Sequence, residues 1–181
     1  IITTSRQCYL KFKNKHKSVI SKAIQNGARF NVREKDDTLV YMCYTEIFDD
    51  HGIVPETFFP TLFQKALNKK YEIRTFYLEE KCYSMVIFSQ KDNKTKTDFR
   101  NYNFDEPNRT MRYNLPIEIE QKIITLMRSL KLDTGSIDLI YTTEDEYIFL
   151  EVNPVGQFGM VSKPCNYGLE KLIATNLAKN D

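Results

Sequence analysis

Short runs of hydrophobic and strand-forming residues recur along the chain, and most of them predict β-strands. Residues 39–48 are rich in β-branched, aliphatic and aromatic side chains. Residues 60–78 and 81–90 form two further runs, and the polar pair Glu79–Glu80 between them predicts a turn. Residues 136–142 and 147–153 flank the polar sequence TEDE and predict another pair of strands.

Two segments show the spacing of apolar residues that is typical of helices. The first begins near Pro116, and Glu118 and Glu120 favour the positive N-terminal end of a helix. The second is the amphipathic sequence LEKLIATNLAK close to the C-terminus. The apolar positions are Ile119, Ile123, Leu126, Met127 and Leu130 in the first, and Leu169, Leu172, Ile173 and Leu177 in the second.

The remaining segments are polar. The first forty residues are basic and are expected to be irregular, and the lysine cluster KFKNKHK at residues 11–17 is interpreted as a solvated face. The alternative for this cluster is a contact with phosphate or with an acidic peptide. Residues 91–109 are rich in turn-forming residues and predict a long loop, and loops of this length are often functional or mobile.

Strands and helices therefore mix without a regular βαβ alternation, which predicts an α+β fold with a largely antiparallel sheet. The chain has 181 residues, 41% of them hydrophobic, which is enough for one sizeable core. A formal charge of only +2 does not demand a polyanionic partner. The sequence has no apolar run of membrane-spanning length.

Cysteine and aromatic residues exclude further classes. The four cysteines lie far apart, without a CxxC pair, and there are only two histidines, so neither a zinc site nor a disulfide framework is expected. The pattern favours reduced cytosolic thiols. Aromatic residues are interleaved with aliphatic rather than basic ones, which argues against a nucleic-acid binder.

One strand carries polar residues where a core strand would not. Side chains alternate along a strand, so Glu151 and Asn153 point to the same face. A hairpin folded about Glu144 and Asp145 places Asp138 directly opposite Glu151, with Cβ atoms about 5 Å apart. Such an oxygen-only set suits a hard cation such as Mg²⁺. Two alternatives remain open: solvent-exposed carboxylates on an open sheet face, and a general acid/base pair.

The carboxylates belong to a longer pattern. The sequence GSIDLIYTTEDEYIFLEVNPVGQFGMVS, followed by CNYGLEKLIA, resembles the C-terminal part of the ATP-grasp ligases that mature ribosomally made peptides. Within that family it is most similar to the grasp-with-spasm maturases, the microviridin-type or graspetide enzymes. VISKAI, PTLFQKALNKKYEIR and DFRNYN agree upstream in the same order. The resemblance therefore covers nearly the whole chain.

The resemblance implies nucleotide-binding roles for several residues. Lys22 matches a lysine that contacts the ATP phosphates; an exposed strand lysine is the alternative. Gln64, Lys65, Ala66 and Leu67 match the hinge whose backbone meets the adenine edge, although Leu67 also suits ordinary strand core. Glu72 and Arg74 match an acidic-x-Arg element beside the nucleotide, and Arg74 suits a structural ion pair equally well.

The resemblance also implies the reacting centre. Arg100 matches an arginine that faces the transferred phosphoryl group or the acyl phosphate, and a solvated loop arginine is the alternative. Asp138, Glu151 and Asn153 match the Mg²⁺ ligands. The family's phosphate-covering loop is usually rich in glycine, whereas the equivalent segment here, residues 25–37, holds only Gly27. Arg29 and Arg33 are candidates to substitute for the missing glycines.

The implied architecture is an ATP-grasp core with mainly antiparallel sheets and two subdomains, roughly residues 1–67 and 68–181. Enzymes of this family carry an additional N-terminal domain, so the chain is expected to be a fragment that lacks it. The catalytic assignments are Arg100 and Arg74, with ATP and Mg as cofactors. Full activity of the fragment alone is not expected.

The implied activity is that of an ATP- and Mg-dependent ligase. It would activate a Glu or Asp side chain of a precursor peptide as an acyl phosphate and join it to a Ser/Thr hydroxyl or Lys amine. The expected partners are a precursor peptide with a leader segment, a radical-SAM/SPASM enzyme encoded nearby and a second copy in a homodimer, in a bacterial cytoplasm. The alternatives are an amino-acid ligase of the glutathione-synthetase or ribosomal-protein-glutamate-ligase type, and a non-catalytic fragment that binds nucleotide or leader peptide.

Overall fold

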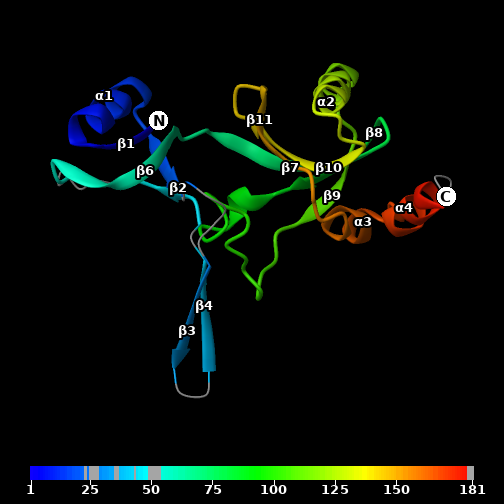
Figure 1. The fold of residues 1–181 in the computed structure, drawn as a ribbon, viewed down its shortest axis with the longest axis horizontal. Helices are drawn as coiled ribbons and strands as arrows, with labels where there is room; N and C mark the ends of the chain where they lie inside the picture. The colour runs from blue at the N-terminus through cyan, green and yellow to red at the C-terminus, as the bar shows by residue number, and fades with distance from the viewer. Residues whose placement is uncertain (23, 25–28, 35–36, 43, 49–53, 179–181) are drawn as a thin grey trace. The chain divides into compact units, whose positions relative to one another are not determined.

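The computed structural model describes residues 1–22, 24, 29–34, 37–42, 44–48 and 54–178 (Figure 1). These form two compact units, the first of residues 1–67 with 93–103 and the second of residues 68–92 with 104–181. Helices and antiparallel sheets occur in both, so the predicted α+β class is confirmed. Residues 93–103 therefore belong to the first unit although they follow residue 67 in the chain.

The first unit holds a four-stranded antiparallel sheet in the order β1-β6-β2-β5 and the helix α1. Its core gathers aromatic side chains around Tyr9 and Phe63, which are 0% and 1% exposed. The expectation that the first forty residues are irregular was wrong, because burial of Tyr9 stabilises α1. The bounds are Ile2–Ser5 for β1, Arg6–His16 for α1, Val19–Lys22 for β2, Glu46–Ile47 for β5 and Thr57–Lys65 for β6.

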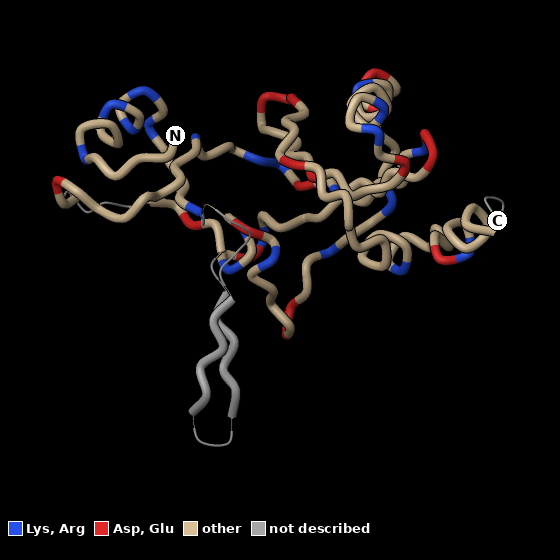
Figure 2. Tube along the Cα trace, in the orientation of Figure 1, with Lys and Arg blue, Asp and Glu red and all other residues tan. Residues whose placement is uncertain are grey.

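Helix α1 also carries most of the lysine cluster. Lys11, Lys13 and Lys15 lie on this helix, which contains no acidic residue (Figure 2). Lys11 and Lys15 are exposed, as the interpretation of a solvated face requires. The helix therefore presents a basic surface.

A two-stranded sheet also belongs to the first unit. β3 (Arg29–Glu34) pairs antiparallel with β4 (Asp37–Met42). The strand predicted over residues 39–48 is therefore divided between β4 and β5. Arg29 and Arg33, the proposed substitutes for glycines, belong to β3, while Gly27 lies outside the described residues.

The second unit is built on a five-stranded antiparallel sheet in the order β11-β10-β7-β8-β9. The turn predicted between β7 and β8 is confirmed, and both of its residues have positive φ, 43° at Glu79 and 64° at Glu80. Two such residues match the twist of a tight hairpin. The strand bounds are Lys69–Leu78 for β7, Lys81–Ile87 for β8, Thr110–Tyr113 for β9, Thr134–Thr142 for β10 and Tyr147–Asn153 for β11.

The long polar segment between β8 and β9 is irregular, as predicted. It begins with the short 3₁₀ helix η1 (Ser89–Lys91) and continues through turns and bends to residue 109. Its middle part, residues 93–103, is the piece that packs with the first unit. The loop therefore begins and ends in the second unit and contributes residues 93–103 to the first.

Helix α2 (Ile117–Ser129) covers one face of the second unit's sheet (Figure 1). Ile123 and Met127 are buried against strand residues that include Ile137 and Leu139. The helix starts after Pro116, as predicted, but Leu130 caps its C-terminus and is 46% exposed rather than buried. The apolar spacing therefore predicted the helix correctly, but its last apolar position, Leu130, does not belong to the core.

The opposite face of the sheet is partly covered by α3 (Gly159–Cys165) and α4 (Leu169–Leu177). Helix α3 was not predicted, because it is short and contains Pro164. It packs through Phe158, whose ring lies 5.9 Å from that of Phe76. The predicted α4 is confirmed, although of its apolar positions Leu169 is buried while Leu177 is 66% exposed.

Membrane-spanning helices and the state of the cysteines can be examined in the described residues. Within them, no helix is long and apolar enough to cross a membrane. Cys8, Cys82 and Cys165 are free thiols, and Cys43 lies outside the described residues. Burial raises the pKa of Cys82 to about 12, so this thiol stays protonated at neutral pH.

Candidate functional site

The site begins where β10 and β11 pair. Asp138 lies opposite Glu151 and Ser136 opposite Asn153, so the predicted register is confirmed at this end of the hairpin. Nearer the turn it was wrong by one residue, because Leu139 pairs with Phe149. A β-bulge accommodates the extra residue, and bulges of this kind redirect side chains.

A third strand adds a positive charge to the row. Arg74 of β7 pairs with Asp138 on the other side of β10, so that Arg74, Asp138 and Glu151 follow one another across three strands. Nη1 of Arg74 donates to both carboxylate oxygens of Asp138, at 3.1 and 3.0 Å. The two side chains are only 12% and 15% exposed. The ion pair that the sequence left open for Arg74 is therefore present.

The carboxamide of Asn153 closes the row at the end of β11. Its Oδ1 accepts a hydrogen bond from the backbone N–H of Val155 at 3.0 Å, while its backbone carbonyl accepts from Gly156 at 3.1 Å. The side chain is exposed. A carbonyl oxygen has two lone pairs, so Oδ1 keeps the capacity to bind a further partner.

These residues fit a divalent cation that takes some of its ligands from elsewhere. Within the described parts of the chain, no three Asp, Glu, His or Cys side chains lie close enough to hold a metal. Asp138, Glu151 and Asn153 instead offer two carboxylates and one amide. Mg²⁺ commonly binds one or two carboxylates and completes its octahedron with water and phosphate oxygens. The donor set therefore suits Mg²⁺ better than it suits a metal that requires a closed protein cage.

Glu72 lies on the same face of β7 as Arg74 and is almost fully buried, at 7% exposure. Lys69 Nζ lies 2.8 Å from its Oε1, and the Ser89 hydroxyl donates to the same oxygen at 2.8 Å. The Lys69 side chain is only 7% exposed. Sequence reasoning missed Lys69, because a lysine in the sequence NKKYE looks solvated.

The first unit carries the other predicted nucleotide residues. Lys22 ends β2 opposite Leu62 of β6. The backbone N–H of Ala66 donates to Ser18 at 3.0 Å immediately after β6 ends. The predicted hinge, Gln64 to Leu67, thus comprises the last two residues of β6 and the two that follow, up to the boundary between the units.

Arg100 also belongs to the first unit, through the loop segment 93–103. Its Nε and Nη2 donate to the two oxygens of Asp98 at 2.9 and 2.6 Å, and Asp98 also accepts from the backbone of Thr45. Burial alone would raise the pKa of Asp98, but the hydrogen bonds from Arg100 and Thr45 outweigh it and lower that pKa. Asp98, given no role from the sequence, orients Arg100; the spacing in DFR was the available signal.

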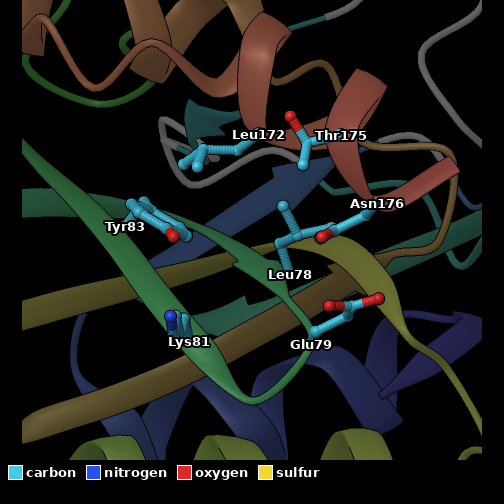
Figure 3. Close-up of a pocket in the computed structure, with 7 residues that line it drawn as sticks. All are labelled: Leu78, Glu79, Lys81, Tyr83, Leu172, Thr175 and Asn176. Atoms are coloured by element: carbon cyan, nitrogen blue, oxygen red, sulfur yellow. The ribbon is translucent and has the colours of Figure 1, made fainter. Parts of the chain in front are cut away.

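The structure therefore collects one subset of the predicted residues. Glu72, Arg74, Asp138, Glu151 and Asn153 share one face of the second unit's sheet, while Lys22, the hinge and Arg100 belong to the first unit. A cavity of about 200 Å³ in the second unit lies elsewhere, between the β7–β8 turn and α4 (Figure 3). It is lined by Leu78, Glu79, Lys81, Tyr83, Leu172, Thr175 and Asn176, none of which was predicted for the site.

Comparisons with known proteins place this geometry in context. No protein-family model and no curated protein matches the sequence. Among solved structures, an ATP-grasp ligase associated with RiPPs from Chryseobacterium gregarium, in complex with ADP and a leader and core peptide, matches with a TM-score of 0.74 and 28% identity. The match covers 87% of this chain and 47% of that one.

Two further structures share the fold. The macrocyclase MdnC, bound with precursor peptide MdnA from Microcystis aeruginosa MRC, has a TM-score of 0.74 and 24% identity over 99% of this chain and 53% of its own. The ATP-grasp ligase PsnB, complexed with a variant precursor, Mg and ADP, has a TM-score of 0.74 and 14% identity over 100% and 52%. The chain thus has an ATP-grasp fold, which confirms the resemblance seen in the sequence. It spans about half the length of these ligases.

Proposed function

We propose, from this ATP-grasp fold, that the chain is the nucleotide- and Mg²⁺-binding part of a peptide ligase. The substrate would be a ribosomally made precursor peptide with a leader segment, because the Chryseobacterium ligase, at 28% identity, is in complex with a leader and core peptide and with ADP. The observation that supports the proposal most directly is the row of Asp138, Glu151 and Asn153 on adjoining strands. The same row of oxygen donors suits a Mg²⁺–nucleotide complex.

The proposed reaction forms an ester or amide between two side chains of the peptide. A carboxylate is a poor acyl donor, since an oxide is a bad leaving group. Transfer of the γ-phosphoryl group of ATP to that carboxylate gives an acyl phosphate and ADP. A Ser/Thr hydroxyl or Lys amine then attacks the acyl carbon and releases phosphate. Such phosphoryl transfer depends mainly on positioning and charge neutralisation.

The residues of the second unit would hold the cation and its nucleotide. Asp138, Glu151 and Asn153 are the proposed ligands, and bound Mg²⁺ would neutralise charge on the phosphate oxygens. Arg74 fixes the orientation of Asp138 through its two hydrogen bonds. We propose that the main role of Arg74 is to orient Asp138. A position of Arg74 and Glu72 beside the nucleotide, as the resemblance implies, stays a prediction.

The residues of the first unit would contact the phosphates and adenine of ATP and the transferred phosphoryl group. Lys22 would bind the ATP phosphates as a point charge, and the backbone of Gln64–Leu67 would meet the adenine. Arg100 would face the transferred phosphoryl group, because a guanidinium is suited to spread negative charge. Asp98 would keep the guanidinium in place, which makes it a positioning residue.

Nucleotide binding tests the proposal first. We expect Mg²⁺ to tighten ADP binding in the wild-type chain, and Glu151→Gln to remove that increase, measured by isothermal titration calorimetry with and without Mg²⁺. Glu146→Gln is the matched control, because it makes the same change of charge on an exposed residue of the same hairpin. Equal Mg²⁺ dependence in all three proteins would contradict the proposed ligand set.

The type of ligation needs the peptide. Enzyme, ATP, Mg²⁺ and a candidate precursor are mixed, and the intact mass of the peptide is recorded. Loss of one water per bond marks an internal crosslink, as proposed, whereas the gain of a residue would indicate the alternative of an amino-acid ligase. Binding of nucleotide and peptide without any change of mass would support a non-catalytic fragment instead.

Other expectations remain predictions with their own tests. A radical-SAM/SPASM enzyme encoded nearby is tested by the neighbouring genes, and a homodimer by the molar mass in solution. A location in the bacterial cytoplasm is a prediction from the resemblance and the free thiols of the described residues.

A further inference from the structure

We infer that Gly156 is a positioning residue for the carboxamide of Asn153, because only a residue without a side chain lets the chain turn back over Ser136. The inference rests on the proposed function, in which Asn153 is a ligand of the Mg²⁺–nucleotide complex. It adds a residue that contributes no ligand atom of its own. It rests on the close approach of Gly156 to Ser136 and on the hydrogen bonds that join the turn to Asn153.

The space at Gly156 is closed on one side by β10. A Cβ added there would lie 2.2 Å from Ser136 Oγ, 2.3 Å from its Cβ and 2.5 Å from its backbone nitrogen. Ser136 is 0% exposed and lies in the interior of the sheet. The nitrogen belongs to the sheet backbone, so a rotation of the serine side chain would not relieve the contact. A larger residue at position 156 must therefore move its own turn.

Movement of that turn acts directly on Asn153. Ser136 is the cross-strand partner of Asn153. The turn that follows Asn153 therefore folds back over the residue that pairs with Asn153. The N–H of Gly156 donates to the backbone carbonyl of Asn153, and the N–H of Val155 donates to its Oδ1. Displacing Gly156 strains both bonds, and the second one holds the proposed ligand atom. The Ser136 hydroxyl has no hydrogen-bond partner among the described residues, so Ser136 acts by contact.

A second glycine provides a matched control. Gly159, three residues further on, starts α3, and a Cβ added there meets nothing within 4 Å. Gly156→Ala and Gly159→Ala thus make the same chemical change in the same segment. They differ in whether the new methyl group meets the sheet.

The test uses Mn²⁺ as a probe of the site in the presence of saturating ADP, with free Mn²⁺ measured by electron paramagnetic resonance. We expect Gly156→Ala to weaken Mn²⁺ binding about 10- to 100-fold, the range for residues that orient metal ligands. ADP affinity without metal should stay at the wild-type value, and Gly159→Ala should match wild type in both measurements. Adding Ser136→Gly to Gly156→Ala removes two of the three close atoms and should recover part of the Mn²⁺ affinity.

Two results would overturn the inference. One is wild-type Mn²⁺ affinity in Gly156→Ala; the other is an equal loss of metal-free ADP binding, which indicates a general collapse of the unit. If Gly156→Ala does not fold, the Ser136→Gly/Gly156→Ala variant decides: weakened Mn²⁺ binding supports the inference and wild-type binding contradicts it. Failure of the proposed function is distinguishable, because wild-type protein itself would then bind no Mn²⁺ with ADP.

Discussion

The two faces of the second unit's sheet use the same strands for different purposes. On one face, Ile137 and Leu139 of β10 pack under α2 in a continuous apolar core. On the other face, Ser136 and Asp138 of the same strand lie beside Arg74, Glu151 and Asn153. Strict alternation of side chains lets one strand serve both faces.

The difference between the faces lies in how each polar or apolar group is satisfied. The apolar face gains free energy simply by excluding water. The polar face must pair its groups: Asp138 has the guanidinium of Arg74, whereas Glu151 and Asn153 remain exposed to solvent. Substitutions should therefore cost stability on the first face and ligand binding on the second, and their effects can be ranked.

The largest effect on stability is expected for Met127→Ala in α2. Met127 is 0% exposed within the apolar core, and removing its side chain should cost about 2–5 kcal/mol of unfolding free energy through lost contacts and a cavity. Urea denaturation measures it. Leu130→Ala, at the C-cap of the same helix and at a residue that is 46% exposed, is the control and should cost much less. Similar losses for both would contradict the assignment of the core to this face.

The second largest effect on stability is expected for a substitution on the polar face. Arg74→Met removes the guanidinium from Asp138, whose side chain is 15% exposed, and should cost about 1–3 kcal/mol because a carboxylate is left without its charged partner. Asp138→Leu in the same background should restore part of that loss, since it removes the charge as well. A double-mutant cycle in urea measures the coupling. Strictly additive losses would mean that the ion pair does not stabilise the sheet.

A smaller effect concerns the tyrosines at the edge of the apolar face. Tyr71 and Tyr147 are hydrogen-bonded through Tyr113, and burial first, then these hydrogen bonds, raise the pKa of Tyr71 and of Tyr147. A raised pKa means that the folded state keeps the proton longer. The stabilisation is therefore complete below the ordinary tyrosine pKa of about 10 and is lost as the pH rises above it.

Unfolding free energies are measured by urea denaturation at pH values from about 8 to about 11, on both sides of the ordinary tyrosine pKa of about 10. We expect the free energy of unfolding to fall at the alkaline end of this range. Tyr113→Phe should cost about 1 kcal/mol at neutral pH and make the alkaline fall shallower, because it removes the shared hydrogen bonds. Tyr83→Phe serves as the control, since Tyr83 lies outside this cluster and its pKa is raised by burial alone. An unchanged alkaline fall in Tyr113→Phe would exclude the cluster as its source.

The smallest effect on stability is expected where the effect on binding is largest. Glu151→Gln changes an exposed side chain, so the urea midpoint should stay at the wild-type value. The same variant should lose the Mg²⁺-dependent part of ADP binding. A stability loss comparable to that of Arg74→Met would show that Glu151 is a structural residue, and the contrast between the two faces would then fail.

Much of the fold was predictable because local pattern and burial agree. The hairpins at Glu79 and at Glu144, the helix after Pro116 and the pairing of Asp138 with Glu151 all follow from alternation and turn chemistry. Helix α1 was missed because its lysines hide one fully buried ring, that of Tyr9. Local patterns report the average face of a segment and give little weight to a single buried residue.

By itself, the sequence determined which residues share a strand face and which oxygen donors stand together, since these depend on spacing within one hairpin. Only the tertiary structure decided their partners. It brought Arg74 to Asp138, Asp98 to Thr45 and Gly156 onto Ser136. These contacts join segments whose distance in the chain carries no periodic signal, so their geometry exists only once the sheet has formed.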